Sequence, residues 1–185
     1  MALYTSGVFP AGGEVGNGGG IIQTVYYYYS DVVSISGNGW NKITNWDAAI
    51  TPTDSTNKIL IHTWLDWSGH DDSYTIAARL YNKTGSGSYS HVSAADGAGG
   101  GNYGNQTVGV FLSGGIQKYD NYARSQSSVC YIDEPNTTST MTYTLYVKDT
   151  RDSNDVRINR AHYYQNHPMM HYTRSGMILQ ELSSW

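Results

Sequence analysis

Alternating apolar and polar positions predict β-strands along this chain. Residues 140–148 (TMTYTLYVK) alternate most regularly. One face takes Met141, Tyr143, Leu145 and Val147, and the other takes Thr140, Thr142, Thr144 and Lys148. In residues 58–67 (KILIHTWLDW), one face takes Ile59, Ile61, Thr63 and Leu65, and the other takes Leu60, His62, Trp64 and Asp66. Because successive side chains of a strand point to opposite faces, both segments are typical of half-buried antiparallel strands.

Segments rich in β-branched and aromatic residues predict further strands at residues 21–29, 74–82, 106–112, 127–133, 155–160 and 176–182. Turns rich in Gly, Asn, Asp, Ser and Pro separate them. Sustained helical periodicity with helix caps is missing from the sequence, which predicts little helix. Short strands joined by such turns favour an all-β fold, an antiparallel β-sandwich that resembles a jelly roll.

The N-terminal 20 residues differ from the rest. They carry little periodic apolar pattern and end in the glycine-rich run EVGNGGG. Because ordering glycine-rich chain costs much backbone entropy, we expect a flexible N-terminal arm over residues 1–20. The arm either stays disordered or orders against a neighbouring protein, with an apolar grip made by Tyr4, Val8, Phe9 and Pro10. Residues 21–185 are expected to form one β-sandwich domain, since the chain length falls within the usual domain size.

Aromatic residues dominate the composition. The 185 residues include 17 Tyr and 5 Trp but only 2 Phe. Tyr suits half-buried sheet faces and contact surfaces, because its ring is apolar and its hydroxyl is polar. So many aromatic side chains can exceed what one core absorbs, and an apolar subunit interface would bury the surplus. The single cysteine, Cys130, lies in a predicted strand, where we expect a small buried residue.

Charge and hydropathy exclude some partners. The formal net charge is −4, only 14% of residues are charged and no basic run stands out, so nucleic acid is not an expected partner. No apolar run approaches the ~20 residues that cross a bilayer, so we expect no membrane insertion. The N-terminus, MALYTSGVFPAGG, lacks the charged and apolar regions of a signal peptide. A soluble protein without an export signal is expected.

Three segments in a fixed order carry a resemblance to a known family. They are residues 50–67 (ITPTDSTNKILIHTWLDW), 129–148 (VCYIDEPNTTSTMTYTLYVK) and 156–164 (VRINRAHYY), followed by the closing strand GMILQEL. Together they resemble the C-terminal β-domains of tail-fibre and other virion proteins of bacteriophages, especially marine and cyanobacterial phages. The resemblance covers about residues 21–182. It implies a jelly-roll-like domain, commonly a homotrimer, on the outside of a virion.

The short arm modifies what this resemblance implies. Fibre domains usually follow a long shaft, whereas here the domain follows only residues 1–20. This arrangement favours a short tail or collar appendage, a fibre or a decoration protein whose arm docks into another virion protein. The expected location is therefore the virion, assembled in the host cytoplasm. The expected partners are further copies of the chain, as a homotrimer, and other virion proteins.

The chain lacks the sequence patterns of an enzyme. No Gly-x-Ser-x-Gly turn is present to hold a nucleophile beside a base. Paired carboxylates for glycoside cleavage are poorly supplied, because Glu is limited to Glu14, Glu134 and Glu181 and most Asp residues fall in predicted turns. The glycine-rich run at residues 94–105 is followed by no Lys-Ser/Thr, so it is not a phosphate loop. We expect no catalytic residues and no cofactor.

Two segments hold potential metal ligands. His162, His167 and His171 lie in RAHYYQNHPMMHY, and imidazoles grouped together can bind zinc. Neither His-x-His nor His-Glu-x-x-His is present, so a polar, aromatic contact loop is the preferred interpretation. Residues 149–155 (DTRDSND) offer clustered oxygens to calcium but lack the EF-hand spacing. The sequence therefore predicts no metal site.

With catalysis and metal binding set aside, the expected activity is the binding of other molecules through aromatic surface residues. Tyr and Trp give contact sites a large area at low entropy cost. The candidate contact residues, in or near predicted loops, are Tyr89, His91, Tyr103, Tyr119, Tyr122, Tyr163, Tyr164, His167 and Tyr172. Since aromatic rings stack on sugar faces, the alternative function is a receptor- or carbohydrate-binding tip domain that contacts a host surface glycan. Several of these rings would instead line the subunit interface.

Overall fold

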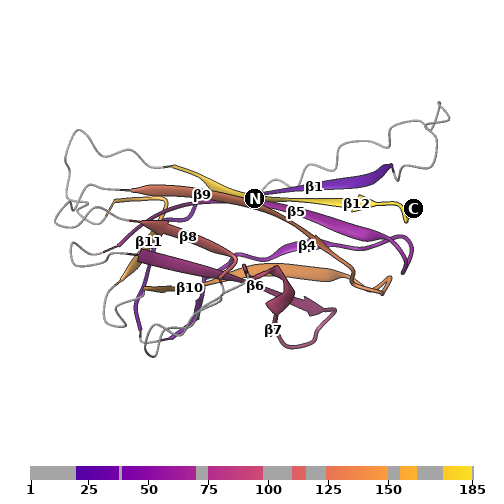
Figure 1. Cartoon of the computed structure of the whole chain (residues 1–185), viewed down its shortest axis with the longest axis horizontal. Helices are drawn as coiled ribbons and strands as arrows, with labels where there is room; N and C mark the ends of the chain where they lie inside the picture. Colours follow the sequence, from indigo (N-terminus) through magenta and orange to yellow (C-terminus); the bar gives the residue numbers. More distant parts are fainter. Residues whose placement is uncertain are drawn as a thin grey trace.

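The computed structural model of the chain describes residues 20–37, 39–69, 75–97, 110–115, 124–149, 155–161 and 173–184. Apart from the short 3-10 helix η1 (Ser93–Ala95), regular structure in these ranges consists of strands (Figure 1). They are β1 (Ile21–Tyr29), β2 (Val33–Ile35), β3 (Asn41–Lys42), β4 (Ala48–Ile50), β5 (Lys58–Gly69), β6 (Thr75–Thr84), β7 (Ser90–His91), β8 (Leu112–Gly115), β9 (Ser125–Asp133), β10 (Met141–Asp149), β11 (Val156–Ile158) and β12 (Ser175–Leu182). The all-β prediction is confirmed for these ranges, while nearly all of the predicted arm lies outside them.

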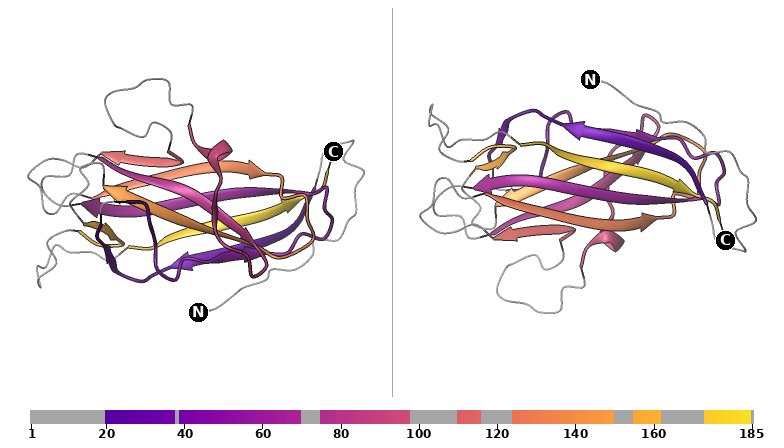
Figure 2. Two further views of the ribbon diagram at one scale, coloured as in Figure 1. Left: turned by 90° about the horizontal axis from the view of Figure 1, so that it is seen from below. Right: turned by 90° about the horizontal axis from the view of Figure 1, so that it is seen from above.

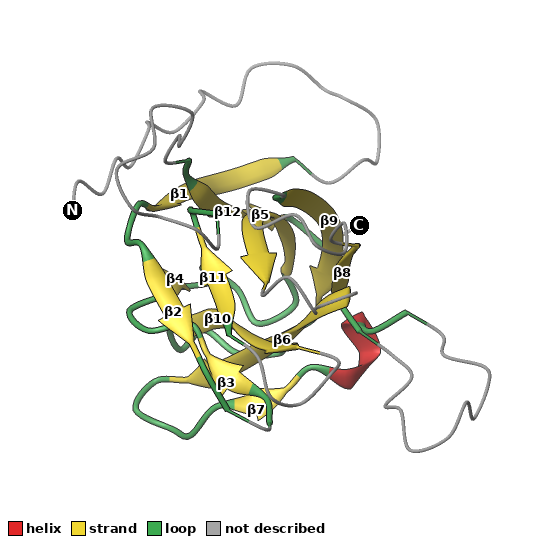
Figure 3. Cartoon of the chain, turned by 90° about the vertical axis from the view of Figure 1, so that its left-hand side faces the viewer, coloured by secondary structure: helices red, strands yellow, loops and turns green. Residues whose placement is uncertain are grey.

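The described strands form two antiparallel sheets of six strands each. In the first sheet β1, β12, β5 and β9 lie side by side in that order, and β11 and β2 continue from the far end of β5. In the second sheet β10 and β6 are central, with β3 and β4 beside β10 and with β7 and β8 beside β6. The two sheets lie face to face (Figures 1 and 3). Because the chain repeatedly crosses between them, the predicted antiparallel, jelly-roll-like β-sandwich is confirmed.

Sequence alternation predicts which side chains of the long strands enter the core, but β10 is more than half-buried, because Thr142 and Thr144 on its predicted polar face are buried as well. Four side chains of β10 enter the core between the sheets: Met141, Tyr143, Leu145 and Val147. On β5, Ile59, Ile61 and Leu65 are fully buried, whereas His62 and Trp64 point outward and are only partly covered. The apolar half of each strand therefore faces the opposite sheet, as its period of two residues predicts.

Three expectations need correction. In the described part of the strand predicted at residues 106–112, only Leu112 lies in a strand, because β8 begins there and Val110 and Phe111 precede it. Strands β2, β3, β4 and β7 were not predicted, since strands of two or three residues show no periodicity and are defined by pairing with β11, β10 and β6. Cys130 is exposed rather than buried, because its neighbours Val129 and Tyr131 point toward the core.

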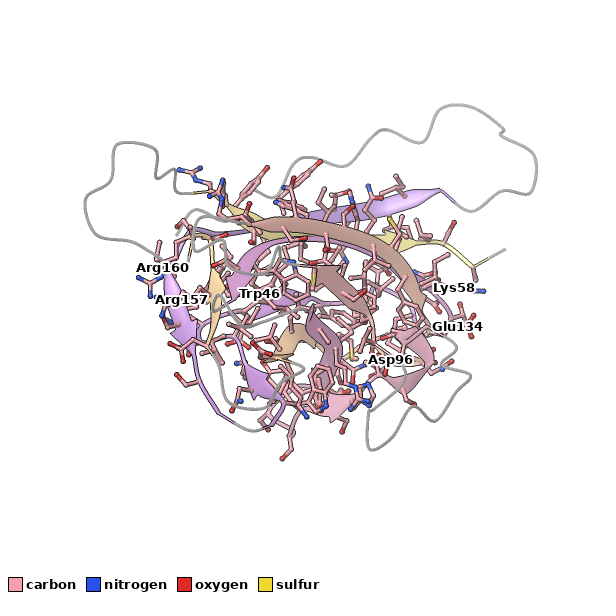
Figure 4. All side chains as sticks on the ribbon, turned by 60° about the vertical axis from the view of Figure 1, so that its left-hand side comes forward. Trp46, Lys58, Asp96, Glu134, Arg157 and Arg160 are labelled. Carbon is pink, nitrogen blue, oxygen red and sulfur yellow. The ribbon has the colours of Figure 1, made fainter. Side chains whose placement is uncertain are left out.

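A buried tryptophan joins β1 to the turn before β4. Trp46 is fully buried between the sheets (Figure 4), and its ring centre lies 5.8 Å from that of Tyr27 and 5.0 Å from that of Tyr29. Both tyrosine hydroxyls donate hydrogen bonds to backbone carbonyls of this turn. Tyr27 and Tyr29 thus belong to the core, and Tyr26 and Tyr28 lie on the outer side of the first sheet.

A buried carboxylate ties β12 to β1 and to the turn before β5. Glu181 is 0% exposed. Its Oε1 accepts hydrogen bonds from the backbone N–H of Thr53 (2.6 Å), the hydroxyl of Thr53 (2.8 Å) and Asn57 Nδ2 (2.7 Å). Its Oε2 accepts one from Gln23 Nε2 (2.6 Å). Burial raises the pKa of Glu181, but these hydrogen bonds outweigh burial and hold that pKa below its ordinary value.

Asn159, which follows β11, fastens the start of β12 to the end of β1. Its φ of 61° is left-handed, a conformation that Asn tolerates better than most residues. Its Nδ2 donates to the carbonyls of Tyr29 (2.9 Å) and Asp31 (3.0 Å), and its Oδ1 accepts from Ser175 Oγ (2.7 Å). Because Asn159 is fully buried, these bonds satisfy groups that water does not reach.

One buried hydrogen bond crosses between the sheets. The hydroxyl of Tyr143 on β10 donates to Asp133 Oδ2 on β9 over 2.7 Å, and Asn82 Nδ2 on β6 lies 3.3 Å from the same oxygen. Burial, followed by the negative charge of Asp133, raises the pKa of Tyr143. The hydroxyl therefore keeps its proton and acts as a donor inside the core.

Candidate interaction surfaces

The outer side of strands β1, β12, β5 and β9 is largely apolar over its middle. Three successive rows of paired residues cross the four strands there, and the view from above in Figure 2 shows these strands side by side. The rows are Thr24–Gln180–Leu60–Ile132, Tyr26–Ile178–His62–Cys130 and Tyr28–Gly176–Trp64–Ser128. None of these residues is Asp, Glu, Lys or Arg. We call the three rows the apolar face; within it Tyr28 is 55% exposed and Ile132 is 43% exposed.

Charged side chains flank the apolar face at both ends. Lys58 precedes the rows on β5, and its Nζ lies 2.8 Å from Glu134 Oε1 (Figure 4). Asp66 follows the rows on β5, and its Oδ1 lies 3.8 Å from Arg124 Nη1. The surface is therefore apolar at its centre and charged at its ends, which is the usual arrangement of a protein–protein contact.

A glycine allows Trp64 to lie over the backbone of β12. A Cβ atom added to Gly176 would lie 2.4 Å from Trp64 Cζ2 and 2.6 Å from the carbonyl oxygen of Tyr27. Trp64 Nε1 donates to the carbonyl of Arg174 (3.1 Å), and the Tyr28 ring meets the indole edge-on at 6.1 Å. Because close packing and a hydrogen bond both hold the indole, it is a rigid part of the apolar face.

A second surface lies on the outer side of the second sheet. Four rings and two lysines gather there, and we call them the Tyr–Lys cluster: Lys42, Tyr81, Lys83, Tyr89, His91 and Tyr146. Strand pairing brings them together, since Lys42 on β3 pairs with Tyr146 on β10, and His91 on β7 pairs with Tyr81 on β6. All six side chains are partly exposed.

The four rings of the Tyr–Lys cluster form a continuous row. The ring centres of His91 and Tyr81 are 5.3 Å apart, and Tyr81 stacks on Tyr146 with 3.9 Å between centres and 27° between planes. Tyr89 meets Tyr146 edge-on at 6.5 Å. Such contacts contribute beyond simple area burial, and they restrict each ring to a narrow range of orientations.

Charged groups surround the Tyr89 ring. Lys42 Nζ and Lys83 Nζ lie 4.6 and 4.9 Å from its centre, within the range of cation–π attraction. The Tyr89 hydroxyl donates to Asp47, whose Oδ1 lies 2.7 Å from Lys42 Nζ. Burial raises the pKa of Asp47, but the hydrogen bonds from Lys42 and Tyr89 outweigh it and lower that pKa. Burial, and then the bond to Asp47, raises the pKa of Tyr89, so at neutral pH Tyr89 keeps its proton while Asp47 is ionised.

A second aspartate holds the other end of the row. Asp96 Oδ2 lies 3.0 Å from His91 Nε2 and 3.5 Å from Arg79 Nε, and the Arg79 guanidinium stacks 4.3 Å from the Trp40 ring centre. Burial raises the pKa of Asp96, although His91 and Arg79 oppose the rise. Both ends of the row are thus fixed by polar contacts.

Of the contact residues predicted from the sequence, the structure places Tyr89 and His91 in one cluster. The others lie outside the described residues: Tyr103, Tyr119, Tyr122, Tyr163, Tyr164, His167 and Tyr172. The predicted arm contacts lie outside them as well: Tyr4, Val8, Phe9 and Pro10. The same holds for His162 and His171 of the histidine-containing segment. Among the residues that the structure does describe, no three His, Cys, Asp or Glu are grouped so that they could hold a metal ion.

Sequence reasoning missed four cluster residues, all of which lie in strands: Lys42, Tyr81, Lys83 and Tyr146. Alternation alone puts Tyr146 on the face of Lys148, and Tyr81 on the face of Lys83. The neighbourhood of Tyr81 and Tyr146 depends on the pairing of β6 with β10, which no local pattern specifies. Only a search for aromatic and cationic residues on the outward faces of the predicted strands would have found them.

Comparisons with known proteins add little to this picture. No protein-family model matches the chain, and no curated protein matches it. Among solved structures, the chain is similar to Eiger TNF from S. frugiperda, with a TM-score of 0.42 and 10% sequence identity over 86% of this chain and 92% of that one. A similarity at this level carries no functional information. The described part of the chain contains no helix that is long and apolar enough to span a membrane.

Proposed function

We propose that the chain is a non-enzymatic structural protein of a bacteriophage virion and that it assembles as a homotrimer through the apolar face. The observation that carries the proposal is this face, which is uncharged over three rows of four strands and which no described strand covers. Large exposed apolar patches on soluble proteins mark interaction sites. The resemblance of residues 50–67, 129–148 and 156–164 to phage virion domains supports both the location in a virion and the trimeric assembly.

The apolar face has the properties of a contact between copies of the same chain. No fixed charge would be buried at the centre of such a contact, which avoids the large desolvation cost of unpaired ions. Trp64 and Tyr28 supply aromatic anchors of the kind that dominate binding energy at interfaces. The ion pair Lys58–Glu134 would remain at the rim, where water solvates it.

Sedimentation velocity of the full chain tests the assembly. The expected mass is three times the chain mass of 20.4 kDa. Ile132→Lys and Tyr28→Lys put a charge on the apolar face and should each give the mass of one chain. Val32→Lys is the matched control, because Val32 is 40% exposed, close to the 43% of Ile132, and lies outside the face. A monomeric or dimeric wild-type chain contradicts the homotrimer, and a trimer that survives both Ile132→Lys and Tyr28→Lys would show that another surface is used.

The same proposal gives residues 1–20 the role of docking into another virion protein. Deletion of these residues should leave the trimer folded but abolish its incorporation into phage particles, as measured by mass spectrometry of purified particles. Cryo-electron microscopy of the wild-type particle would give the position and copy number. Normal incorporation of the truncated chain would contradict the docking role.

A second candidate function is a receptor- or carbohydrate-binding tip domain. The observation that favours it is the Tyr–Lys cluster, in which Tyr89 and His91 join further rings and two lysines on an exposed sheet face. Binding of the isolated protein to host cells or to a glycan array tests this candidate. Absence of binding across hosts would contradict it.

A further inference from the structure

We infer that the Tyr–Lys cluster binds an anionic saccharide, with the sugar packed against the row of rings and Lys83 paired with its carboxylate or sulfate group. The inference rests on the second candidate function and specifies its ligand and its site. It places the site on the outer face of the second sheet, whereas the sequence pointed only to loops.

The rings form an aromatic surface longer than one side chain. His91, Tyr81, Tyr146 and Tyr89 follow one another through three successive ring contacts. Sugar rings present apolar C–H faces, which pack well against aromatic side chains, and tyrosine hydroxyls at the edge can bond to sugar hydroxyls. The size and polarity of this row therefore match a saccharide better than a wholly apolar ligand.

Lys83 gives the cluster its preference for an anionic ligand. Lys42 is paired with Asp47, but Lys83 forms no ion pair with any described residue and lies over the Tyr89 ring. Its ammonium group is therefore available to a ligand that lies against the row of rings. The chain as a whole carries a net charge of −4 and would repel anions, so attraction at this face has to be local.

The site is largely preorganised. Asp47 orients the hydroxyl of Tyr89, Tyr81 stacks on Tyr146, and Asp96 holds His91. Rings that already hold one orientation lose little conformational entropy when a ligand binds. Cation–π contacts at an exposed site stabilise a fold only weakly, so fold stability alone does not account for six such residues on one face.

The test uses the full chain on a glycan array that carries neutral and anionic oligosaccharides, followed by titration calorimetry with one pair of probes. Hyaluronan and chitin hexasaccharides suit this purpose, because they have equal length and only hyaluronan carries carboxylates. Anionic glycans should dominate the array, and the affinity for the anionic probe should fall as salt is raised, since screening weakens exposed charge pairs.

Variants then locate the site. Lys83→Gln and Tyr89→Ala should each weaken binding of the best anionic glycan by about tenfold, the loss of one charged contact or one stacked ring. Tyr89→Phe keeps the ring and should retain most of the affinity. Lys58→Gln removes the same charge as Lys83→Gln from the other sheet and should bind like the wild type.

The possible outcomes separate this inference from the function on which it rests. Binding of neutral glycans only would overturn the anionic site and leave a carbohydrate-binding function in place. Absence of any glycan binding would overturn both. Anionic binding that survives Lys83→Gln and Tyr89→Ala would overturn the assignment to the Tyr–Lys cluster.

Discussion

Replacing Glu181 with Gln tests whether one buried carboxylate secures the end of the sheet that carries the apolar face. The glutamine carbonyl can keep the acceptor position used by Thr53 and Asn57. Its NH₂ group then faces Gln23 Nε2, a donor that cannot turn away without losing its second bond, to the carbonyl of Thr51 (2.7 Å). The variant therefore loses one hydrogen bond to a charged acceptor, and the others become bonds to a neutral one.

Hydrogen bonds to charged groups contribute about 1.5–3 kcal/mol each, so Glu181→Gln should lower the free energy of unfolding at pH 7 by about 2 kcal/mol. For a chain of this size that corresponds to a fall in Tm of roughly 4–8 °C. Urea and thermal unfolding should be measured at one fixed protein concentration, because assembly also affects stability. Glu134→Gln is the matched control: Glu134 is exposed and paired with Lys58, and such a surface pair contributes about 0–1 kcal/mol.

The effect of Glu181→Gln should also depend on pH in one direction. The pKa of Glu181 is lowered from 4.5 in the folded chain, so the carboxylate stabilises the fold fully above about pH 4.5. That stabilisation is lost as pH falls through the folded pKa. The stability difference between wild type and Glu181→Gln should therefore be largest near neutral pH and narrow in acid. Equal stability of Glu181→Gln and Glu134→Gln at pH 7, or a difference that widens in acid, would refute this reasoning.

Two further substitutions probe the buried polar contacts. Asn159→Ala removes the donor to one buried and one partly buried carbonyl and should cost about 2–3 kcal/mol in urea unfolding. Asn136→Ala, at an exposed residue with similar positive φ, should cost less than about 1 kcal/mol, and equal losses would mean that backbone strain alone matters. Tyr143→Phe leaves the buried carboxylate of Asp133 without its closest donor and should cost about 2 kcal/mol; an unchanged urea midpoint would contradict that role.

The sequence predicts the long strands and their faces because these depend on local alternation. Strand β1 coincides with the predicted residues 21–29, and β10 is shifted by one residue from 140–148. The division of core and outer residues on β5 also follows the pattern of residues 58–65, whereas Asp66, which the pattern assigns to the outer face, is buried. Burial of alternate side chains against the opposite sheet enforces this pattern, so the fold class is readable without any partner information.

The candidate surfaces depend on pairings between distant strands, which the sequence does not reveal. Tyr81 and Tyr146 are 65 positions apart and meet only because β6 pairs with β10. Cys130 shows the same limit, since a lone cysteine in a strand looks like a core residue until its neighbours are seen to point inward. The sequence does not reveal that Gly176 makes room for the Trp64 ring, because that ring comes from the paired strand β5.

The two candidate surfaces lie on opposite outer faces of the sandwich, and this placement makes the two proposals compatible. Copies that associate through the apolar face of the first sheet would leave the Tyr–Lys cluster of the second sheet uncovered on every copy (Figure 1). A trimer would then present three identical saccharide sites pointing away from its centre. Linked sites raise the overall avidity for a repeating surface polymer far above the affinity of one site. A shallow row of rings on a sheet can therefore serve host attachment without the deep pocket that a monomeric binding protein would need.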